Sequence, residues 1–204
     1  DFHQDSSVWF PALYEKPEFY QAVISCYRRD ISPYLETMAL QTLPQLAEMT
    51  AILGHEKDYQ KFHALSCKLK EVYKRHFLKK DRVASERQCK YVRPLSMHLV
   101  DGTAAETIAA KLNEICIAGE YKIGTGFLTT WQVLQVLTDY GYADTAYRML
   151  ENTKQPGWLY AVSKGATTVW ENWEGITKKG EPVDSHNHYA PGAVVAWLFS
   201  HCAG

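Results

Sequence analysis

Apolar residues recur every three or four positions along most of this chain, which is the spacing of one face of an α-helix. The longest such stripe runs from Tyr59 to Phe77 and has lysines on its opposite face, so we expect a long amphipathic helix with one solvated side. The same spacing predicts further helices over residues 17–31, 42–53, 103–118, 129–140, 142–152 and 191–201.

Local signals indicate where several of these helices begin and end. Thr42 with Gln45, and Thr103 with Glu106, have the spacing of a capping box, which predicts two helix starts. Gly54 and Gly119 are placed to end the same two helices, since glycine favours the residue after a helix. Residues 88–99 give no clear pattern because a proline interrupts them.

Residues 155–192 break the helical pattern. A stretch rich in Val, Tyr, Trp and Thr surrounds a Ser-Lys-Gly turn, which predicts a short β-hairpin near residues 158–170. Pro191 then suits the first turn of a last helix. About seven or eight helices with short connections predict an all-α fold of stacked helical hairpins, either a closed α/α toroid or an open solenoid. The lack of a fixed sequence period disfavours the solenoid.

Composition narrows the class of protein. A net charge of -1 and a pI near 6.8 provide no electrostatic footprint for nucleic acid. The sequence contains no uninterrupted apolar stretch near the roughly 20 residues of a membrane span, so we expect no membrane partner. Five scattered cysteines cannot all pair within the chain, which favours a reducing, cytoplasmic compartment. A signal peptide on a longer parent protein is the alternative, so the localisation stays open. Because the chain starts at Asp1 without Met, we expect a piece of a longer protein.

Aromatic residues make up 13% of the chain, including six Trp and thirteen Tyr. Their flat apolar faces and polar edges suit sugar rings, but helical cores also use aromatic residues. The position of these residues therefore decides the interpretation.

The densest candidate site lies in residues 165–175, where two carboxylates and two indoles occur within five positions. Hydrolysis of a glycosidic bond needs two carboxyl groups, one as an acid and one as a base or nucleophile. Glu171 and Glu174 are candidates for one such role, and Trp170 and Trp173 for sugar contacts. In an extended segment Glu171 and Trp170 would point to opposite sides. The alternative is that both indoles anchor the core and both glutamates are solvated.

A second candidate site lies in residues 184–189, just before the last helix. His186 and His188 could bind sugar hydroxyls, or could bind zinc with Asp184, although no H-E-x-x-H motif accompanies them. Alternatively Asn187 or His188 caps the following helix. The Gly-Thr-Gly-Phe segment around Thr125 lacks the residues of a phosphate loop, so we expect a tight turn beside a pocket.

Four segments in this order resemble motifs of bacterial α-L-rhamnosidases, an inverting glycoside hydrolase family with an α/α six-hairpin barrel. They are residues 123–128 (IGTGFL), 147–150 (YRML), 165–173 (GATTVWENW) and 187–192 (NHYAPG). The resemblance extends over residues 123–200, and residues 37–78 fit the preceding helical pair less distinctively. Two positions depart from the family, Pro191 where Phe is usual and Asn172 where Arg is frequent.

The resemblance implies a role for each matched residue. It makes Glu171 the general base that activates water, and His188 a sugar contact. It implies that Trp170 and Trp173 shape the rhamnose pocket. Further substrate contacts would come from the matched positions Asn187, Glu174 and Thr125. No metal and no cofactor are implied.

The resemblance also implies that residues 1–204 are the C-terminal part of a catalytic barrel that removes terminal α-L-rhamnose from glycosides or polysaccharides. The family's general acid lies upstream, and nothing between Asp1 and Glu36 resembles its motif. We therefore expect the missing N-terminal part as a partner and little activity from this chain alone. Two alternatives stay open: another barrel glycosidase acting on glucosides, fucosides or unsaturated uronides, and a non-catalytic helical interaction module.

Overall fold

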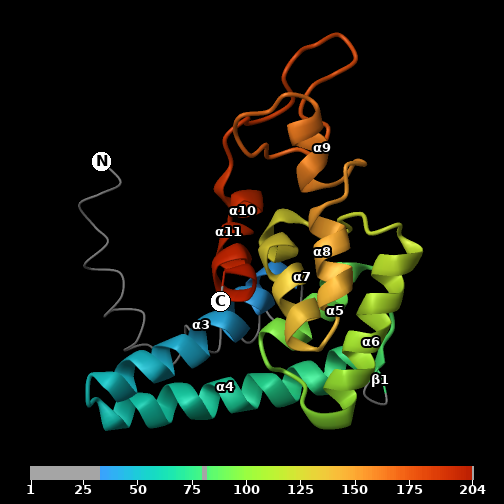
Figure 1. Cartoon of the computed structure of the whole chain (residues 1–204). Helices are drawn as coiled ribbons and strands as arrows, with labels where there is room; N and C mark the ends of the chain where they lie inside the picture. The colour runs from blue at the N-terminus through green and yellow to red at the C-terminus, as the bar shows by residue number, and fades with distance from the viewer. Residues whose placement is uncertain (1–32, 80–81, 204) are drawn as a thin grey trace, which may run out of the picture. The chain divides into compact units, whose positions relative to one another are not determined.

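The computed structural model describes residues 33–79 and 82–203, with side chains from residue 39 onward (Figure 1). The helix expected over residues 17–31 lies outside the described residues. The chain divides into two compact units between Ser66 and Cys67. Within the described residues, no helix is long and apolar enough to cross a membrane.

The first unit contains α3 (Pro33–Ile52) and the start of α4 (Glu56–Phe77). The helix start predicted at Thr42 is wrong, because α3 begins at Pro33 and continues through Pro44. Residues 35–41 are mostly strong helix formers, which favour the longer helix. Gly54 ends α3 as predicted: its φ is +74°, and the His55 N–H reaches back to the Thr50 carbonyl at 2.9 Å.

The long amphipathic helix predicted up to Phe77 is confirmed as α4. Its first turn is acidic and its last turn basic, the distribution that complements the helix dipole. In the second unit α4 is followed by an antiparallel pair of two-residue strands, β1 (Leu78–Lys79) and β2 (Arg82–Val83). The segment that the sequence left open then forms α5 (Gln88–Ser96).

Three helices follow: α6 (Gly102–Ala118), α7 (Phe127–Asp139) and α8 (Ala143–Leu150). Gly119 follows α6 as predicted, but the capping box at Thr103 does not form, because the N-cap residue is Asp101. The Asp101 carboxylate makes an ion pair with Lys70 at 3.3 Å instead of capping the helix. The two predicted helices on either side of Gly141 are confirmed as α7 and α8, which pack against each other.

The α7 helix is the centre of the second unit. It contacts α5, α6, α8 and two short helices near the C-terminus, α10 (Tyr189–Gly192) and α11 (Val195–Trp197). Its buried residues come from most of its circumference. A helix with such a wide buried surface belongs in a core and not on a surface. Because α7 is held on several sides, its N-terminus is a rigid support for the neighbouring segments.

The β-hairpin predicted near residues 158–170 is wrong, because residues Trp158–Ser163 form a short helix, α9. The reason is tertiary: the Trp158 indole is buried and donates its N–H to the Pro191 carbonyl at 2.9 Å. Antiparallel pairing occurs later, in residues 168–188, which we call the arm. Backbone N–H groups of Glu171, Thr177 and Val183 pair across it with the carbonyls of Ser185, Glu181 and Gly175. Figure 1 shows the arm as the orange loop beyond α9.

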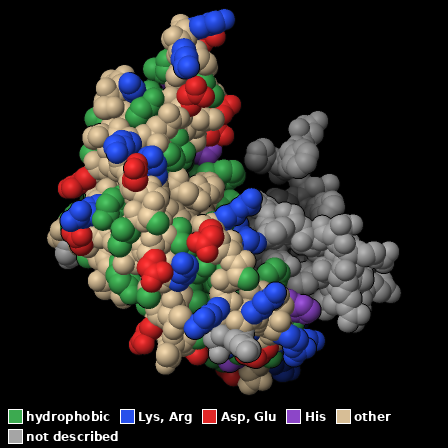
Figure 2. Space-filling model, turned by 90° about the vertical axis from the view of Figure 1, so that its right-hand side faces the viewer, with side chains coloured by type: hydrophobic (Ala, Val, Ile, Leu, Met, Phe, Trp, Pro, Cys, Tyr) green, Lys and Arg blue, Asp and Glu red, His purple; other side chains and the backbone are tan. Residues whose placement is uncertain are grey.

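The last predicted helix forms as three consecutive short pieces, α10 (Tyr189–Gly192), α11 (Val195–Trp197) and a π-helix at Leu198–Cys202. Trp197 is buried and donates its indole N–H to the Thr138 hydroxyl at 2.9 Å, which ties this segment to α7. Acidic and basic side chains are interspersed over the face seen in Figure 2, in keeping with a net charge of -1.

Candidate functional site

A pocket of about 230 Å³ lies at the N-terminus of α7, between the arm and α10. Three of the sequence motifs contribute to it, although they are far apart along the chain. Its lining consists of Thr125, Gly126, Phe127, Thr130, Glu171, Asn172, Trp173 and Pro191. The sequence analysis singled out Thr125, Glu171 and Trp173, which the fold brings together here.

The floor of the pocket is fixed by hydroxyl groups. Thr125 and Thr130 are buried, and their hydroxyls hydrogen-bond each other at 2.9 Å. The turn before them is held by Gln88, which accepts the Gly124 N–H at 2.7 Å and donates to the Lys122 carbonyl at 2.9 Å. The expected tight turn beside a pocket is confirmed, and its anchor is a buried side chain of α5.

Glu171 reaches the pocket from the arm, and its side chain is 40% exposed. Its backbone N–H donates to the Ser185 carbonyl at 2.9 Å, and its Oε2 accepts the Ser185 N–H at 3.3 Å. The second oxygen, Oε1, lies 3.8 Å from His188 Nε2. The carboxylate is therefore oriented by the opposite side of the arm and still open to water.

Trp170 points away from Glu171, as the predicted alternation requires. Its indole is buried and stacks on His186 with ring centroids 5.0 Å apart. His186 Nε2 in turn contacts the Gly175 carbonyl at 2.6 Å. Trp170 and His186 thus form the packed interior of the arm and do not line the pocket.

His188 caps α10, one of the two roles that the sequence left open for it. Its Nδ1 accepts the Ala190 N–H at 3.3 Å, so the proton of the neutral ring lies on Nε2. The Nε2 atom is the one nearest Glu171. The cap therefore leaves Nε2, the ring nitrogen that it does not use, on the side of the carboxylate.

The other predicted contacts lie around the pocket with different partners. Trp173 lines it and packs edge-on against Trp158 with centroids 5.7 Å apart. Glu174 and Asn187 are exposed and outside the lining. Asn172 lines the pocket and donates to the Asp184 carboxylate at 3.0 Å. Phe127 and Thr130 also line the pocket, and their position just after the glycine-rich turn was the one sequence signal for them.

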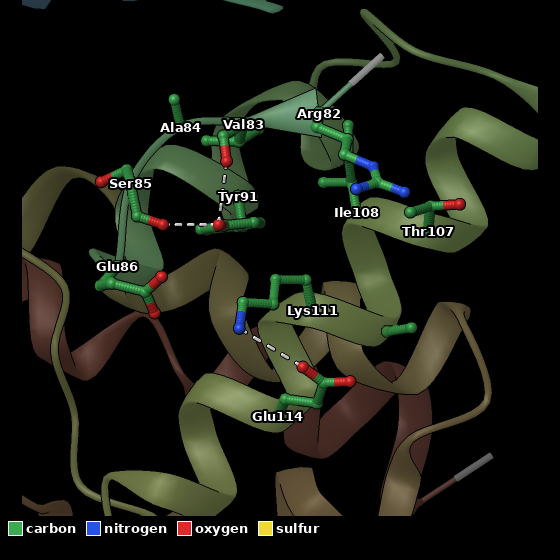
Figure 3. Close-up of a pocket in the computed structure, with 11 residues that line it drawn as sticks. Arg82, Val83, Ala84, Ser85, Glu86, Tyr91, Thr107, Ile108, Lys111 and Glu114 are labelled. Carbon is green, nitrogen blue, oxygen red and sulfur yellow. Dashed lines mark hydrogen bonds and ion pairs between the residues drawn. The ribbon is translucent and has the colours of Figure 1, made fainter. Parts of the chain in front are cut away.

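A second pocket, of about 740 Å³, lies between the β2–α5 connection and α6 (Figure 3). Three of its polar side chains have partners within the lining: Lys111 pairs with Glu114 at 3.4 Å, and the Tyr91 hydroxyl is held by the carbonyls of Val83 and Ser85. The four motifs contribute no residue to its lining. We therefore take the smaller pocket as the candidate active site. Within the described chain, no three His, Cys, Asp or Glu side chains are grouped to hold a metal ion.

An open pocket with a carboxylate, an indole and fixed hydroxyls, mounted on helical hairpins, is suited to a sugar ring. The sequence model of the bacterial alpha-L-rhamnosidase 6 hairpin glycosidase domain matches residues 33–202. The chain therefore belongs to this family, and the predicted all-α fold, part of a six-hairpin barrel, is confirmed.

The similar proteins are themselves α-L-rhamnosidases. That of Streptomyces avermitilis is 36% identical over 163 residues, or 78% of this chain and 16% of its own length. That of Formosa agariphila is 29% identical over 164 residues, or 78% of this chain and 18% of its own length.

Two solved structures share the fold. The native α-L-rhamnosidase from Aspergillus terreus has a TM-score of 0.73 and 31% identity, over 78% of this chain and 19% of its own. The Streptomyces avermitilis α-L-rhamnosidase complexed with L-rhamnose has a TM-score of 0.73 and 34% identity, over 79% of this chain and 16% of its own. The chain thus spans less than a fifth of the length of these relatives.

Proposed function

We propose that this chain is the C-terminal part of the catalytic barrel of an α-L-rhamnosidase, which removes terminal α-L-rhamnose from glycosides or polysaccharides. The observation that supports this most is the position of Glu171 at the pocket, where it is oriented by Ser185 and His188 yet open to water. Membership of the family and the relative that binds L-rhamnose support the choice of sugar.

In the proposed mechanism Glu171 is the general base of an inverting hydrolysis. Its carboxylate takes a proton from a water molecule as the water oxygen bonds to the anomeric carbon. The bond from that carbon to the leaving oxygen breaks, and a carboxylic acid on the opposite side protonates that oxygen. His188 orients the base through Nε2, and Thr125 and Trp173 line the sugar pocket.

The carboxylic acid partner is assigned to a part of the enzyme outside this chain. Inverting enzymes separate the two carboxyl groups by roughly 6.5–9.5 Å, which leaves room for the water. A base without its acid can deprotonate water but cannot assist departure of a poor leaving group. We therefore expect the 204-residue chain alone to be inactive or nearly so.

The test compares Glu171→Gln with the wild-type complete enzyme on p-nitrophenyl α-L-rhamnoside under saturating substrate. Removal of the base should lower kcat by roughly 10²- to 10⁴-fold, with folding and rhamnose binding retained. Glu181→Gln is the matched control, because Glu181 is exposed, belongs to the same arm and does not line the pocket. Unchanged turnover of Glu171→Gln would contradict the assignment. A wild-type enzyme without activity on this substrate, but active on another nitrophenyl sugar, would contradict the choice of rhamnose.

A further inference from the structure

Three aromatic side chains form a row beside the candidate pocket, and we call Phe127, His188 and Tyr189 the aromatic lip. Phe127 lines the pocket, and its ring meets the edge of the His188 ring with centroids 5.9 Å apart and planes at 72°. The His188 ring stacks on that of Tyr189 at 5.2 Å and 17°. The row is therefore continuous from the pocket to its rim.

The end of the row is open to solvent although its position is fixed. Tyr189 is 80% exposed and Phe127 48%, whereas the His188 side chain between them is 18% exposed. Tyr189 begins α10, whose first turn is capped by His188 and which packs on α7. An aromatic ring with two rotatable bonds, already stacked on a fixed neighbour, loses little conformational entropy when it binds a ligand.

The hydroxyl of Tyr189 is also free for a ligand. Among the described residues it hydrogen-bonds to no other group. An exposed ring therefore offers one apolar face and one polar edge next to a sugar pocket. This combination suits a ring that presents C–H groups or a π-system on its face and hydroxyls at its edge.

We propose that the aromatic lip is the subsite for the leaving group, where Tyr189 stacks on the flat ring attached to the rhamnose. This inference rests on the proposed function. Its occupant is a pyranose or an aromatic aglycone, because both present a flat face to the Tyr189 ring.

The order of residues along the lip supports this position. Phe127 lines the pocket, and His188 Nε2 lies 3.8 Å from the Glu171 carboxylate. Tyr189 stacks on His188 at 5.2 Å between centroids and is outside the pocket lining. A group attached to the rhamnose also lies outside the pocket that holds the rhamnose, so Tyr189 is the member of the lip placed to contact such a group.

The test measures ligand binding by calorimetry to the complete enzyme in a Glu171→Gln background, so that no ligand is hydrolysed. Three probes share the rhamnose and differ in what it is attached to: methyl α-L-rhamnoside, p-nitrophenyl α-L-rhamnoside, and a rhamnosyl-glucoside with a methyl aglycone. Tyr189→Ala should weaken binding of the two ring-bearing probes by roughly 2- to 10-fold, the size expected for one aromatic contact, and leave methyl rhamnoside unchanged.

Two control variants separate the contact from general effects. Tyr189→Phe keeps the stacking face and should retain most of the ring preference. Phe199→Ala removes a side chain of similar exposure, 73%, outside the lip and should change nothing.

Each other outcome has a definite meaning. A loss confined to the aryl probe or to the glucoside identifies the aromatic or the sugar ring as the occupant. Equal weakening of all three probes would overturn the lip as a leaving-group subsite, because Tyr189 would then bind the rhamnose. If Tyr189→Ala leaves the binding of the two ring-bearing probes unchanged, the lip is likewise not the leaving-group subsite. If methyl rhamnoside fails to bind while other sugars do, the proposed function fails.

Discussion

At the scale of single residues, Glu171 of the arm lines the pocket while its neighbour Trp170 is buried against His186. Gly175 makes this packing possible: its φ is +64°, and a Cβ there would lie 1.8 Å from the Trp170 ring. Glycine is therefore required at position 175 for two reasons: its positive φ disfavours other residues, and the Trp170 ring occupies the place of a Cβ atom. Gly180, near the tip of the arm, also has a positive φ of +81° but nothing within 4 Å of an added Cβ.

We expect Gly175→Ala to lower the free energy of unfolding by about 2–4 kcal/mol, since overpacking adds to backbone strain. Gly180→Ala introduces backbone strain without overpacking and should lower the free energy of unfolding by about 1 kcal/mol. Urea unfolding of the two variants measures the difference. Similar small losses in both would show that Trp170 can move aside.

The sequence predicted part of this arrangement. The alternation of an extended segment placed Trp170 and Glu171 on opposite sides, and this is confirmed. The contacts of Glu171 with Ser185 and His188 were not predictable, because no local pattern tells which backbone groups pair across a loop. Likewise nothing in the composition indicated that Gln88, far away in the chain, holds the turn before Thr125.

At the scale of secondary structure elements, helices with a long apolar stripe were predicted well and short segments were not. The stripe up to Phe77 keeps helical spacing over many residues, so α4 could be predicted without knowing its neighbours, although Phe62 is its one buried residue among those described. Trp158 and its neighbours have the composition of a strand, yet form α9 because the Trp158 indole binds the Pro191 carbonyl. Such a tertiary contact outweighs the weak preferences of six residues.

The link between α5 and the pocket yields a prediction. Gln88→Met keeps the side-chain volume but leaves the Gly124 N–H and the Lys122 carbonyl without their partner, so we expect a loss of about 2–3 kcal/mol in unfolding free energy. Rhamnose binding should weaken as well, because the turn carries Thr125.

The control is Gln60→Met. The Gln60 amide makes an exposed hydrogen bond with Glu56, so its loss should lower the free energy of unfolding by less than about 0.5 kcal/mol. An equal effect of both variants would contradict a special role for Gln88.

At the scale of the whole molecule, composition and motif order predicted the class of protein better than periodicity did. The apolar spacing left both a toroid and a solenoid open. The lack of a fixed sequence period disfavoured the solenoid, and the family resemblance then indicated the six-hairpin barrel. The chain covers 16–19% of the length of the relatives described above, in keeping with the prediction that it is a part of a longer protein.

The burial of Cys116 in the core of the second unit leads to a prediction about the reactivity of its thiol. Cys116 is fully buried on α6, and burial raises the pKa of its thiol from 9.0 to about 12. Because the folded-state pKa is the higher one, the stability contributed by the protonated thiol is present below pH 9.0 and is lost as the pH rises toward about 12.

We therefore expect iodoacetamide at pH 8 to modify the exposed Cys67 and Cys202 in the native protein and to leave Cys116 unmodified until urea unfolds it. Mass spectrometry of the labelled peptides measures the order. Labelling of Cys116 at the rate of Cys67 would show that the core around α6 opens readily.

The main-chain pairing of the arm has an evolutionary consequence. Glu171 and His188 are kept at a fixed spacing by backbone hydrogen bonds near the base of the arm, from Glu171 to Ser185 and from His188 to Val169. The turn at residues 177–181 takes no part in that spacing. A longer, shorter or different turn at the tip would therefore leave the spacing of Glu171 and His188 unchanged. The tip of the arm is thus a place where the sequence is free to vary, whereas the residues near the arm's base are constrained by their pairing.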